Sequence, residues 1–291
     1  MATLEIQKVD LASFCYLNKE RYPFLLESVN HNEINRYSIL FAFPEEKIVL
    51  RDFSDFIFLN ELENQLEPSN DNSNLPFTGG WFVYLSYELI GQIEPTLASK
   101  LHKSNIPIAY AVKIPSAVIT DHKLKKTFII DKDGNQTRVN KILSDIKALE
   151  NIPDKAINGK IKEENKKKFT DGVKSSLDYI VAGDVFQVNL SREWSYSLSS
   201  NQDSAIIYQK LKKANPAPFS ALIQYEDFSI ISSSPERLFS VNDGVLETRP
   251  IAGTHPRAKG HLDNTQKENL ISNPKEIAEH VMLLDLERND M

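Results

Sequence analysis

The stretch FSALIQYEDFSIISSSPERLFSVNDGVLETRPI, residues 219–251, decides the fold class. Two apolar runs, FSALIQY and FSIISSS, flank Glu226 and Asp227, and a second pair, RLFSV and VLETRPI, flanks residues 242–244. Short apolar runs separated by Asn, Asp and Gly are typical of β-hairpins, and Asp-Gly is a strong turn signal. The stretch therefore predicts two successive antiparallel hairpins.

Residues 1–150 have the same character. Short apolar runs at 36–43, 47–53, 79–89 and 125–131 lie between turn signals, and helical periods are weak, so we expect strands and hairpins. The composition then shifts in the lysine-rich segment 151–168, which has no interleaved aromatic residues and is typical of a solvated linker. This segment predicts a junction between an N-terminal region, 1–150, and a second region, 151–291.

The second region begins with an expected helix and an expected strand. The helix carries an apolar stripe of Phe169, Val173, Leu177 and Ile180. Gly183 is placed to end this helix. In VFQVNLS, residues 185–191, the period changes to two, which predicts a strand with Phe186 on a core face and Gln187 on the other.

A final helix is expected after the N-cap candidate Asn273, with Pro274 at its first position. Glu276 and Glu279 then lie one turn apart on one face, although Glu276 is equally interpreted as a capping carboxylate. The apolar stripe of this helix consists of Ile277, Val281 and Leu284. Beside such a core face an unpaired Glu279 would be costly, and a metal ion or a basic partner would offset the cost.

Composition excludes several classes of protein. The chain has 291 residues, 41% hydrophobic and 25% charged, which is globular and long enough for one large domain or two modest ones. A net charge of -6 gives no electrostatic footprint for nucleic acid. The single cysteine, Cys15, excludes an intramolecular disulfide. The sequence shows neither the basic-then-apolar pattern of a signal peptide nor an apolar run long enough to span a membrane. We therefore expect a cytoplasmic protein without membrane association.

The ordered motifs closely resemble those of the chorismate-utilising enzymes. The matching stretches are GDVFQVNLSREW at 183–194, SSSPERL at 232–238, ETRPIAGTHPR at 247–257 and KEIAEHVMLLDLERND at 275–290. YPFLLES at 22–28, RYSILF at 36–41 and GGWFVYLSYEL at 79–89 resemble the N-terminal region of the same proteins. The family includes the component I subunits of aminodeoxychorismate synthase and anthranilate synthase. The resemblance implies an α+β fold in which two antiparallel-rich sheets pack against each other with helices around them.

The resemblance also implies site residues and chorismate as substrate. Glu279 matches the family glutamate that ligates Mg²⁺, and Glu276 matches a neighbouring acidic position of that metal site. Glu236 matches the general acid that protonates the departing hydroxyl, a role that requires a buried, protonated carboxyl. Gly253 and Thr254 match the loop that holds the substrate, and Thr254 is also a catalytic candidate. The implied metal acts as a Lewis acid and template.

Gln187 distinguishes branches of the family. Relatives that add water carry a lysine here as the base, whereas a neutral amide cannot deprotonate water. Ammonia needs no such base, so Gln187 is a catalytic and substrate-binding candidate of an ammonia-using enzyme. In that branch a glutamine amidotransferase subunit delivers the ammonia, and we expect it as the protein partner.

The motifs leave two possible products of the reaction. Asn189 in QVNLS and the segment SSSPERL resemble the para-aminobenzoate branch, which makes 4-amino-4-deoxychorismate for folate biosynthesis. Ala252 in PIAGT instead resembles anthranilate synthases of tryptophan biosynthesis, because some aminodeoxychorismate synthases carry a nucleophilic lysine there. We favour aminodeoxychorismate synthase component I, acting without a lysine adduct at this position, with anthranilate synthase component I as the alternative.

The resemblance carries two further expectations. Relatives continue past the RND stretch at 288–290 with a second metal-ligating glutamate, which implies that 151–291 is only the first part of the catalytic domain. A truncated, catalytically silent fragment that keeps binding surface is therefore a third hypothesis. Near the other end, Leu25, Leu26, Glu27 and Ser28 resemble the family's tryptophan site, and core packing by the leucines is the plain alternative.

Overall fold

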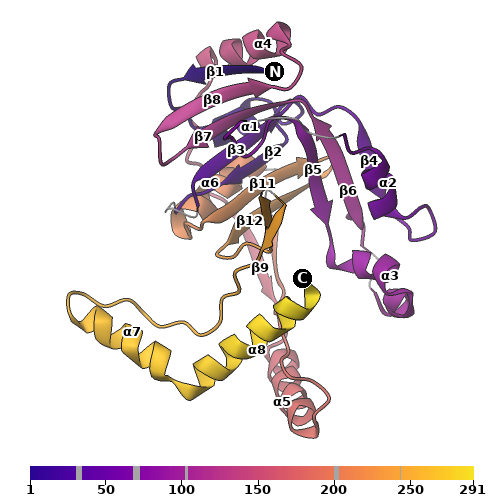
Figure 1. Ribbon diagram of the computed structural model, residues 1–291, viewed down its shortest axis with the longest axis vertical. Helices are drawn as coiled ribbons and strands as arrows, with labels where there is room; N and C mark the ends of the chain where they lie inside the picture. The colour runs from indigo at the N-terminus through magenta and orange to yellow at the C-terminus, as the bar shows by residue number, and fades with distance from the viewer. Residues whose placement is uncertain (31–34, 68–72, 102–103, 200–202, 243) are drawn as a thin grey trace.

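The computed structural model describes residues 1–30, 35–67, 73–101, 104–199, 203–242 and 244–291 (Figure 1). Its strands are β1 (Ala2–Ile6), β2 (Phe24–Glu27), β3 (Tyr37–Ala42), β4 (Lys47–Leu50), β5 (Gly80–Leu85), β6 (Ala109–Ile114), β7 (Ser116–Asp121), β8 (Lys126–Asp131), β9 (Gly159–Glu163), β10 (Trp194–Leu198), β11 (Phe219–Tyr225), β12 (Phe228–Ser234), β13 (Ser240–Asn242) and β14 (Val245–Glu247). Its helices are α1 (Leu11–Leu17), α2 (Phe58–Asn64), α3 (Ile90–Ile93), α4 (Gln136–Lys147), α5 (Lys166–Ala182), α6 (Ser204–Ala214), α7 (Leu262–Ser272) and α8 (Pro274–Asp290), with short 3-10 helices η1 (Tyr87–Leu89) and η2 (Pro95–Lys100).

The largest sheet combines strands from distant parts of the sequence. Its order is β1-β8-β7-β3-β2-β11-β12, and every neighbouring pair is antiparallel. β11 pairs with β2 in the register Leu25 to Leu222. The sheet thus takes strands from both sides of residue 150, and the division into regions 1–150 and 151–291 stays a prediction.

A second sheet, in the order β4-β6-β5, packs face to face on the first. Phe24 of β2 stacks on Phe82 of β5 with ring centroids 4.0 Å apart. Tyr110 of β6 stacks on Tyr225 of β11 at 4.2 Å. These aromatic pairs join the two sheets, and they confirm the expected α+β class with two packed antiparallel sheets.

Helices cover the outer faces of both sheets. α1, α4 and α6 place Phe14, Ile142 and Tyr208 in the core cluster on the far face of the large sheet. Phe58 of α2 and Leu89 of η1 do the same on the outer face of the small sheet. The resulting order of layers is helices, large sheet, small sheet and helices (Figure 1). No helix in the described ranges is long and apolar enough to cross a membrane.

The predicted hairpins and helix ends are confirmed. β11 and β12 flank Glu226 and Asp227 as expected, and β13 pairs with β14, although position 243 of their turn lies outside the described residues. α5 ends at Gly183, which has the left-handed φ of 83° that glycine adopts most readily. The side chain of Asn273 caps α8 by accepting a hydrogen bond from the Lys275 amide.

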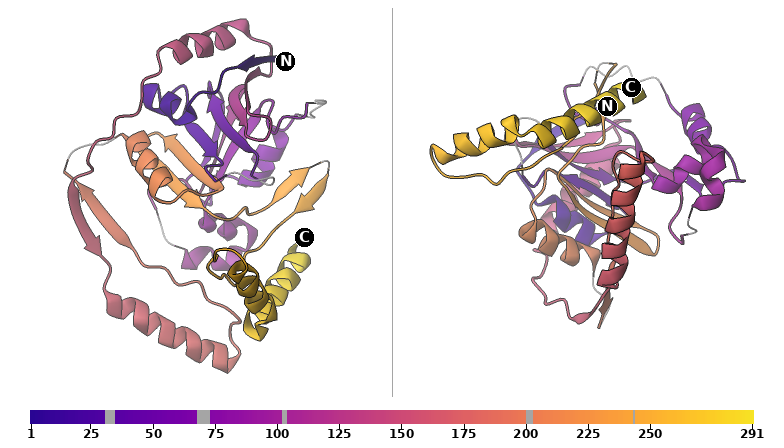
Figure 2. Two further views of the ribbon diagram at one scale, coloured as in Figure 1. Left: turned by 90° about the vertical axis from the view of Figure 1, so that its left-hand side faces the viewer. Right: turned by 90° about the horizontal axis from the view of Figure 1, so that it is seen from below.

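The remaining elements project from this layered body. The β9–β10 ribbon, the β13–β14 hairpin and α5, α7 and α8 include no fully buried residue. Figure 2 shows α5 and the α7–α8 pair at the opposite end of the molecule from α4.

Two predictions for this projecting part are wrong. Residues 185–191 form no strand, and the Phe186 side chain is 83% exposed rather than on a core face. A strand needs a hydrogen-bonded neighbour, and the described residues offer none here. The α8 stripe also faces solvent, with Ile277, Val281 and Leu284 between 46% and 59% exposed. On α8, Glu276 and Glu279 are instead half-buried, and Glu276 lies against Gly253.

Candidate functional site

The predicted substrate loop lies directly against the first turn of α8. An ideal Cβ atom built on Gly253 would lie 1.6 Å from Oε2 of Glu276 and 3.0 Å from its Cβ atom. Real Cβ atoms essentially never lie within 3.0 Å of another atom, so a side chain at 253 would require the Glu276 carboxylate, the flexible end of its side chain, to move away. The requirement comes from the close approach of the carboxylate and not from an unusual φ.

Glu236 contacts the same loop through a hydrogen bond. Its Oε1 accepts a 2.7 Å hydrogen bond from the Ile251 amide, which ties the end of β12 to the loop after β14. The Ser234 hydroxyl accepts a hydrogen bond from the Glu236 amide at 3.3 Å. The structure thus brings Glu236, the Gly253 loop and Glu276 into one arrangement. Glu236 itself is exposed, which differs from the buried position that a general acid at this site needs.

Glu276 and Glu279 fit the requirements of a magnesium ion. They lie one turn apart on the half-buried face of α8, and their carboxylate oxygens are ligands that Mg²⁺ prefers. Mg²⁺ commonly takes one or two protein carboxylates and completes its shell with waters and substrate oxygens. Within the described ranges no group of three or more His, Cys, Asp or Glu side chains could hold a metal ion, and a metal-binding role of this pair stays a prediction.

Among the described residues, Thr254 and Gln187 make no side-chain hydrogen bond or ion pair with the other predicted site residues. The Thr254 hydroxyl is exposed and donates a hydrogen bond to the Ala252 carbonyl at 3.3 Å, within its own loop. Gln187 is exposed in the irregular segment after α5. In the part of the chain that the structure describes, no hydrogen bond or ion pair joins Gln187 to Glu236, Gly253 or the α8 glutamates.

A pocket of about 360 Å³ opens beside the segment that resembles a tryptophan site. Glu27 there accepts hydrogen bonds from Lys212 at 2.8 Å and from the Tyr208 hydroxyl at 2.7 Å. Burial, followed by the charge of Glu27, raises the pKa of Tyr208 and keeps its hydroxyl protonated. Leu25 is fully buried and Ser28 nearly so. The sequence indicated Glu27 and Ser28 but not Lys212, which lies 185 residues from Glu27 and carries no motif.

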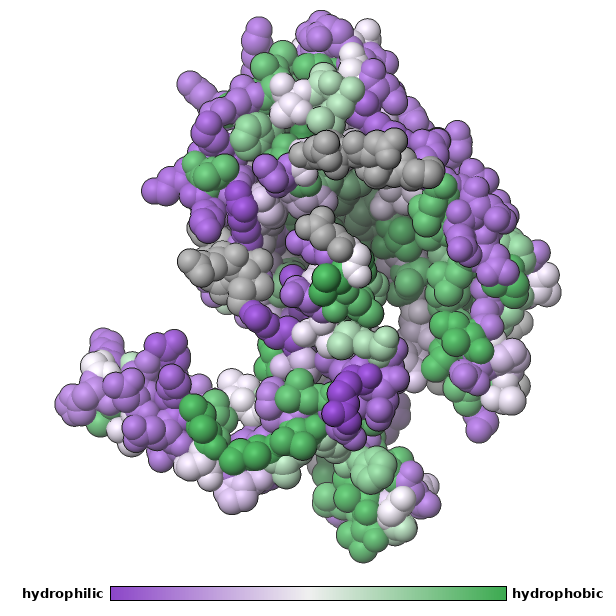
Figure 3. Space-filling view, viewed as in Figure 1, coloured by the Kyte–Doolittle hydropathy of each residue, from purple (hydrophilic) through white to green (hydrophobic). Residues whose placement is uncertain are grey.

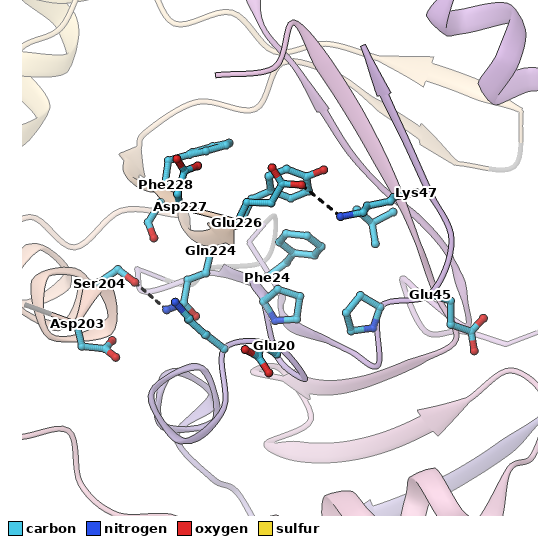
Figure 4. A pocket seen from close by; sticks show the side chains of 16 residues that line it. Glu20, Phe24, Glu45, Lys47, Asp203, Ser204, Gln224, Glu226, Asp227 and Phe228 are labelled. Carbon is cyan, nitrogen blue, oxygen red and sulfur yellow. Dashed lines mark hydrogen bonds and ion pairs between the residues drawn. The ribbon is translucent and has the colours of Figure 1, made fainter. Parts of the chain in front are cut away.

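A second pocket, of about 850 Å³, lies at the turn of the β11–β12 hairpin (Figure 4). The Gln224 amide donates to the Ser204 hydroxyl at 2.7 Å, and Lys47 pairs with Glu226 at 3.3 Å. Burial raises the pKa of Tyr225 to about 12. None of the predicted site residues lines this pocket, which no sequence motif indicated.

The two packed antiparallel sheets and the glutamate-bearing helix against a glycine loop define an α+β protein of the component I type. The chain belongs to the family described as chorismate binding enzyme, whose members match it over residues 21–291.

Individual relatives agree with this assignment. Anthranilate synthase component 1 of Lactococcus lactis is 30% identical over 301 residues, covering 94% of this chain and 65% of its own. Aminodeoxychorismate synthase component 1 of Bacillus subtilis is 36% identical over 239 residues, covering 78% of this chain and 50% of its own. The crystal structure of anthranilate synthase component I from Streptococcus pneumoniae superposes with a TM-score of 0.73 at 27% identity, covering 91% of this chain and 62% of that chain. The chain thus spans between half and two thirds of the length of these relatives.

Proposed function

We propose that this chain is the chorismate-binding part of an aminodeoxychorismate synthase component I, which converts chorismate and ammonia to 4-amino-4-deoxychorismate. The observation that carries the proposal is the contact of Gly253 with Glu276, because it joins the predicted substrate loop to the predicted metal-binding helix. The para-aminobenzoate-type motifs QVNLS and SSSPERL, together with the 36% identity to the Bacillus subtilis enzyme, support this branch.

The residues of the arrangement have distinct roles in this proposal. Glu279 and Glu276 would hold a magnesium ion, which would supply Lewis-acid chemistry and help to orient the substrate. The loop at Gly253 and Thr254 offers backbone N–H groups to the anionic substrate. Glu236 fixes that loop through the Ile251 amide and is the proton donor to the leaving hydroxyl once its surroundings exclude water.

Gln187 and a partner subunit complete the proposal. A neutral amide at 187 positions ammonia without acting as a base, so the nucleophile is ammonia and not water. A glutamine amidotransferase subunit supplies it, as expected of a component I protein.

Product analysis tests the proposal. The chain is incubated with chorismate, Mg²⁺ and ammonium, and the lyase that releases para-aminobenzoate is then added. Formation of para-aminobenzoate supports the proposal, whereas fluorescent anthranilate and pyruvate identify the alternative, which Ala252 favours.

A catalytically silent fragment is the second candidate. The exposed Glu236 and Gln187 favour it, because neither lies in the water-excluding setting that acid catalysis and amination need. Turnover of chorismate by the purified 291-residue chain contradicts this candidate. Tight binding of chorismate without turnover supports it.

A further inference from the structure

The pocket of about 850 Å³ at the turn of the β11–β12 hairpin, which we call the hairpin pocket, has no role in the proposed chemistry. Its walls come mainly from four separate parts of the chain, within residues 19–24, 44–47, 203–204 and 224–229. Its volume lies in the range of roughly 300–1,000 Å³ that is typical of small-molecule sites. The fold thus holds a cavity of ligand size apart from the arrangement of Glu236, Gly253 and Glu276.

Gln224 is a buried polar side chain in the wall of the hairpin pocket. It is 6% exposed and lies on the same face of β11 as Leu222, which packs in the core cluster shared with α6. Its Nε2 atom donates a 2.7 Å hydrogen bond to the Ser204 hydroxyl at the start of α6. Its Oε1 atom accepts no hydrogen bond from any residue that the structure describes. A buried amide oxygen without a donor is costly, and a ligand with an N–H group would remove that cost.

The lining of the hairpin pocket is predominantly acidic, with five acidic and two basic side chains. Three of the acids already have partners. Glu226 pairs with Lys47 at 3.3 Å, and Glu45 pairs with Arg138 at 3.1 Å. Asp203 accepts a hydrogen bond from the amide of residue 205 and so offsets the positive end of the α6 dipole.

The other two acids, Glu20 and Asp227, are exposed and form no hydrogen bond or ion pair within the described ranges. In Figure 4 they lie on opposite sides of Gln224. Lys19 is the one lining cation without a partner among the described residues, so the unpaired groups of the pocket carry an excess of negative charge. This charge favours a cationic ligand.

We propose that the hairpin pocket binds an aliphatic diamine, in which two ammonium groups are joined by a chain of methylene groups. One ammonium group donates to Oε1 of Gln224 and lies near Glu20, and the other lies near Asp227. The torsion of a glutamine amide has a broad energy minimum, so a small rotation presents Oε1 to the ligand. The rings of Pro23 and Pro44 offer apolar surface to the methylene chain.

Titration calorimetry with 1,4-diammoniobutane tests this inference without chorismate or Mg²⁺, and therefore separately from the proposed function. An aliphatic probe is needed because exposed apolar side chains on α5 and α8, which Figure 3 shows toward the foot of the molecule, would also take up an aromatic amine. We expect saturable one-to-one binding. Butylammonium has the same chain length and a single charge, and it should bind at least tenfold more weakly.

A matched pair of variants locates the site. Glu20→Gln removes an exposed carboxylate of the pocket, and Glu63→Gln removes an exposed carboxylate of α2 outside it. Both variants change the net charge of the chain equally. We expect roughly threefold weaker binding for Glu20→Gln, which is the scale of an exposed ion pair, and unchanged binding for Glu63→Gln.

Gln224→Leu tests the buried acceptor. The variant keeps an apolar side chain in the wall but removes Oε1, so we expect at least tenfold weaker binding of 1,4-diammoniobutane. Circular dichroism of the free chain checks its fold. If this variant does not fold, the comparison of the two amines and the pair at 20 and 63 decide the question.

Four results overturn the inference. The first is the absence of saturable binding, and the second is equal binding of butylammonium. The third is an equal loss in Glu20→Gln and Glu63→Gln, which would show a general attraction of the diamine to a chain of net charge -6. The fourth is wild-type binding by a folded Gln224→Leu.

Discussion

At the residue scale, the contact between Gly253 and Glu276 makes a sharp prediction. Gly253→Ala should displace the Glu276 carboxylate from the loop, because the new Cβ atom would overlap Glu276 Oε2. We expect amide exchange at 251–254 to accelerate in hydrogen-exchange mass spectrometry, because the loop loses this contact.

Gly172→Ala is the control for that variant. A Cβ atom at 172 would meet Leu190 at 3.7 Å, which is ordinary van der Waals contact, and alanine favours the helix. Unchanged loop exchange in Gly253→Ala, or equal effects of both variants, would contradict the predicted role of Gly253.

Asp131 governs the acid stability of the large sheet. Burial by itself would raise the pKa of this fully buried carboxyl, but hydrogen bonds from Arg138 and Ser116 lower it below its ordinary 3.8. A carboxyl with a lowered folded pKa stabilises the protein above the unfolded value, and the contribution is lost as pH falls through the folded value. We therefore expect the free energy of unfolding to decrease when the pH is lowered below about 4.

Urea unfolding of Asp131→Asn between pH 2 and pH 7 measures this contribution. The variant should be about 3 kcal/mol less stable at pH 7 and lose less stability on acidification, because it has no charge to neutralise. Asp133→Asn is the control, since its side chain is 59% exposed and should change stability by less than about 1 kcal/mol. A parallel acid dependence in wild type and Asp131→Asn would refute the assignment.

At the element scale, two asparagine caps should behave differently. Asn135 caps α4 and Asn165 caps α5, each by accepting a backbone amide hydrogen bond. α4 packs Val139 and Ile142 into the core, whereas α5 buries nothing. Asn135→Ala should lower the global free energy of unfolding by about 1 kcal/mol.

Asn165→Ala should only increase local fraying of α5. We expect an unchanged urea midpoint together with faster amide exchange in residues 166–170. An equal shift of both midpoints would show that α5 unfolds with the core, contrary to its exposed packing.

The elements also show where sequence reasoning succeeds. Local signals determine β11, β12 and the ends of α5 and α8, because turn residues and caps act within a few positions. The prediction of a strand at 185–191 is wrong because alternation of apolar and polar residues specifies the two faces of a strand but not a neighbouring strand for it to pair with. Long-range contacts, such as Lys212 with Glu27 and β11 with β2, leave no trace in a single sequence.

For the candidate site, too, the sequence predicts some features and not others. Motif resemblance selects Glu236, Gly253 and Glu276, which the structure brings together. It does not give the exposure of Glu236, because exposure depends on what packs over the loop. The roles of these three residues, like those of Gln187, Thr254 and Glu279, stay predictions.

At the scale of the whole molecule, the projecting elements should unfold locally more easily than the two packed sheets. Brief trypsin digestion of the isolated chain should cut first in the lysine-rich residues 160–168 and in α8, since these parts include no fully buried residue. The two packed sheets should resist, and mass spectrometry of the early fragments tests this. Early cleavage between β6 and β8 would contradict the layered core.

The position of β11 between β2 and β12 also determines when the large sheet can be completed during synthesis of the chain. β2 gains its second neighbour only after residues 219–225 leave the ribosome. At roughly 5–20 residues per second, the interval after β3 is on the order of 10 to 35 s. During it the edge of β2 has no partner strand, so the nascent chain is a substrate for chaperones that shield unpaired strands.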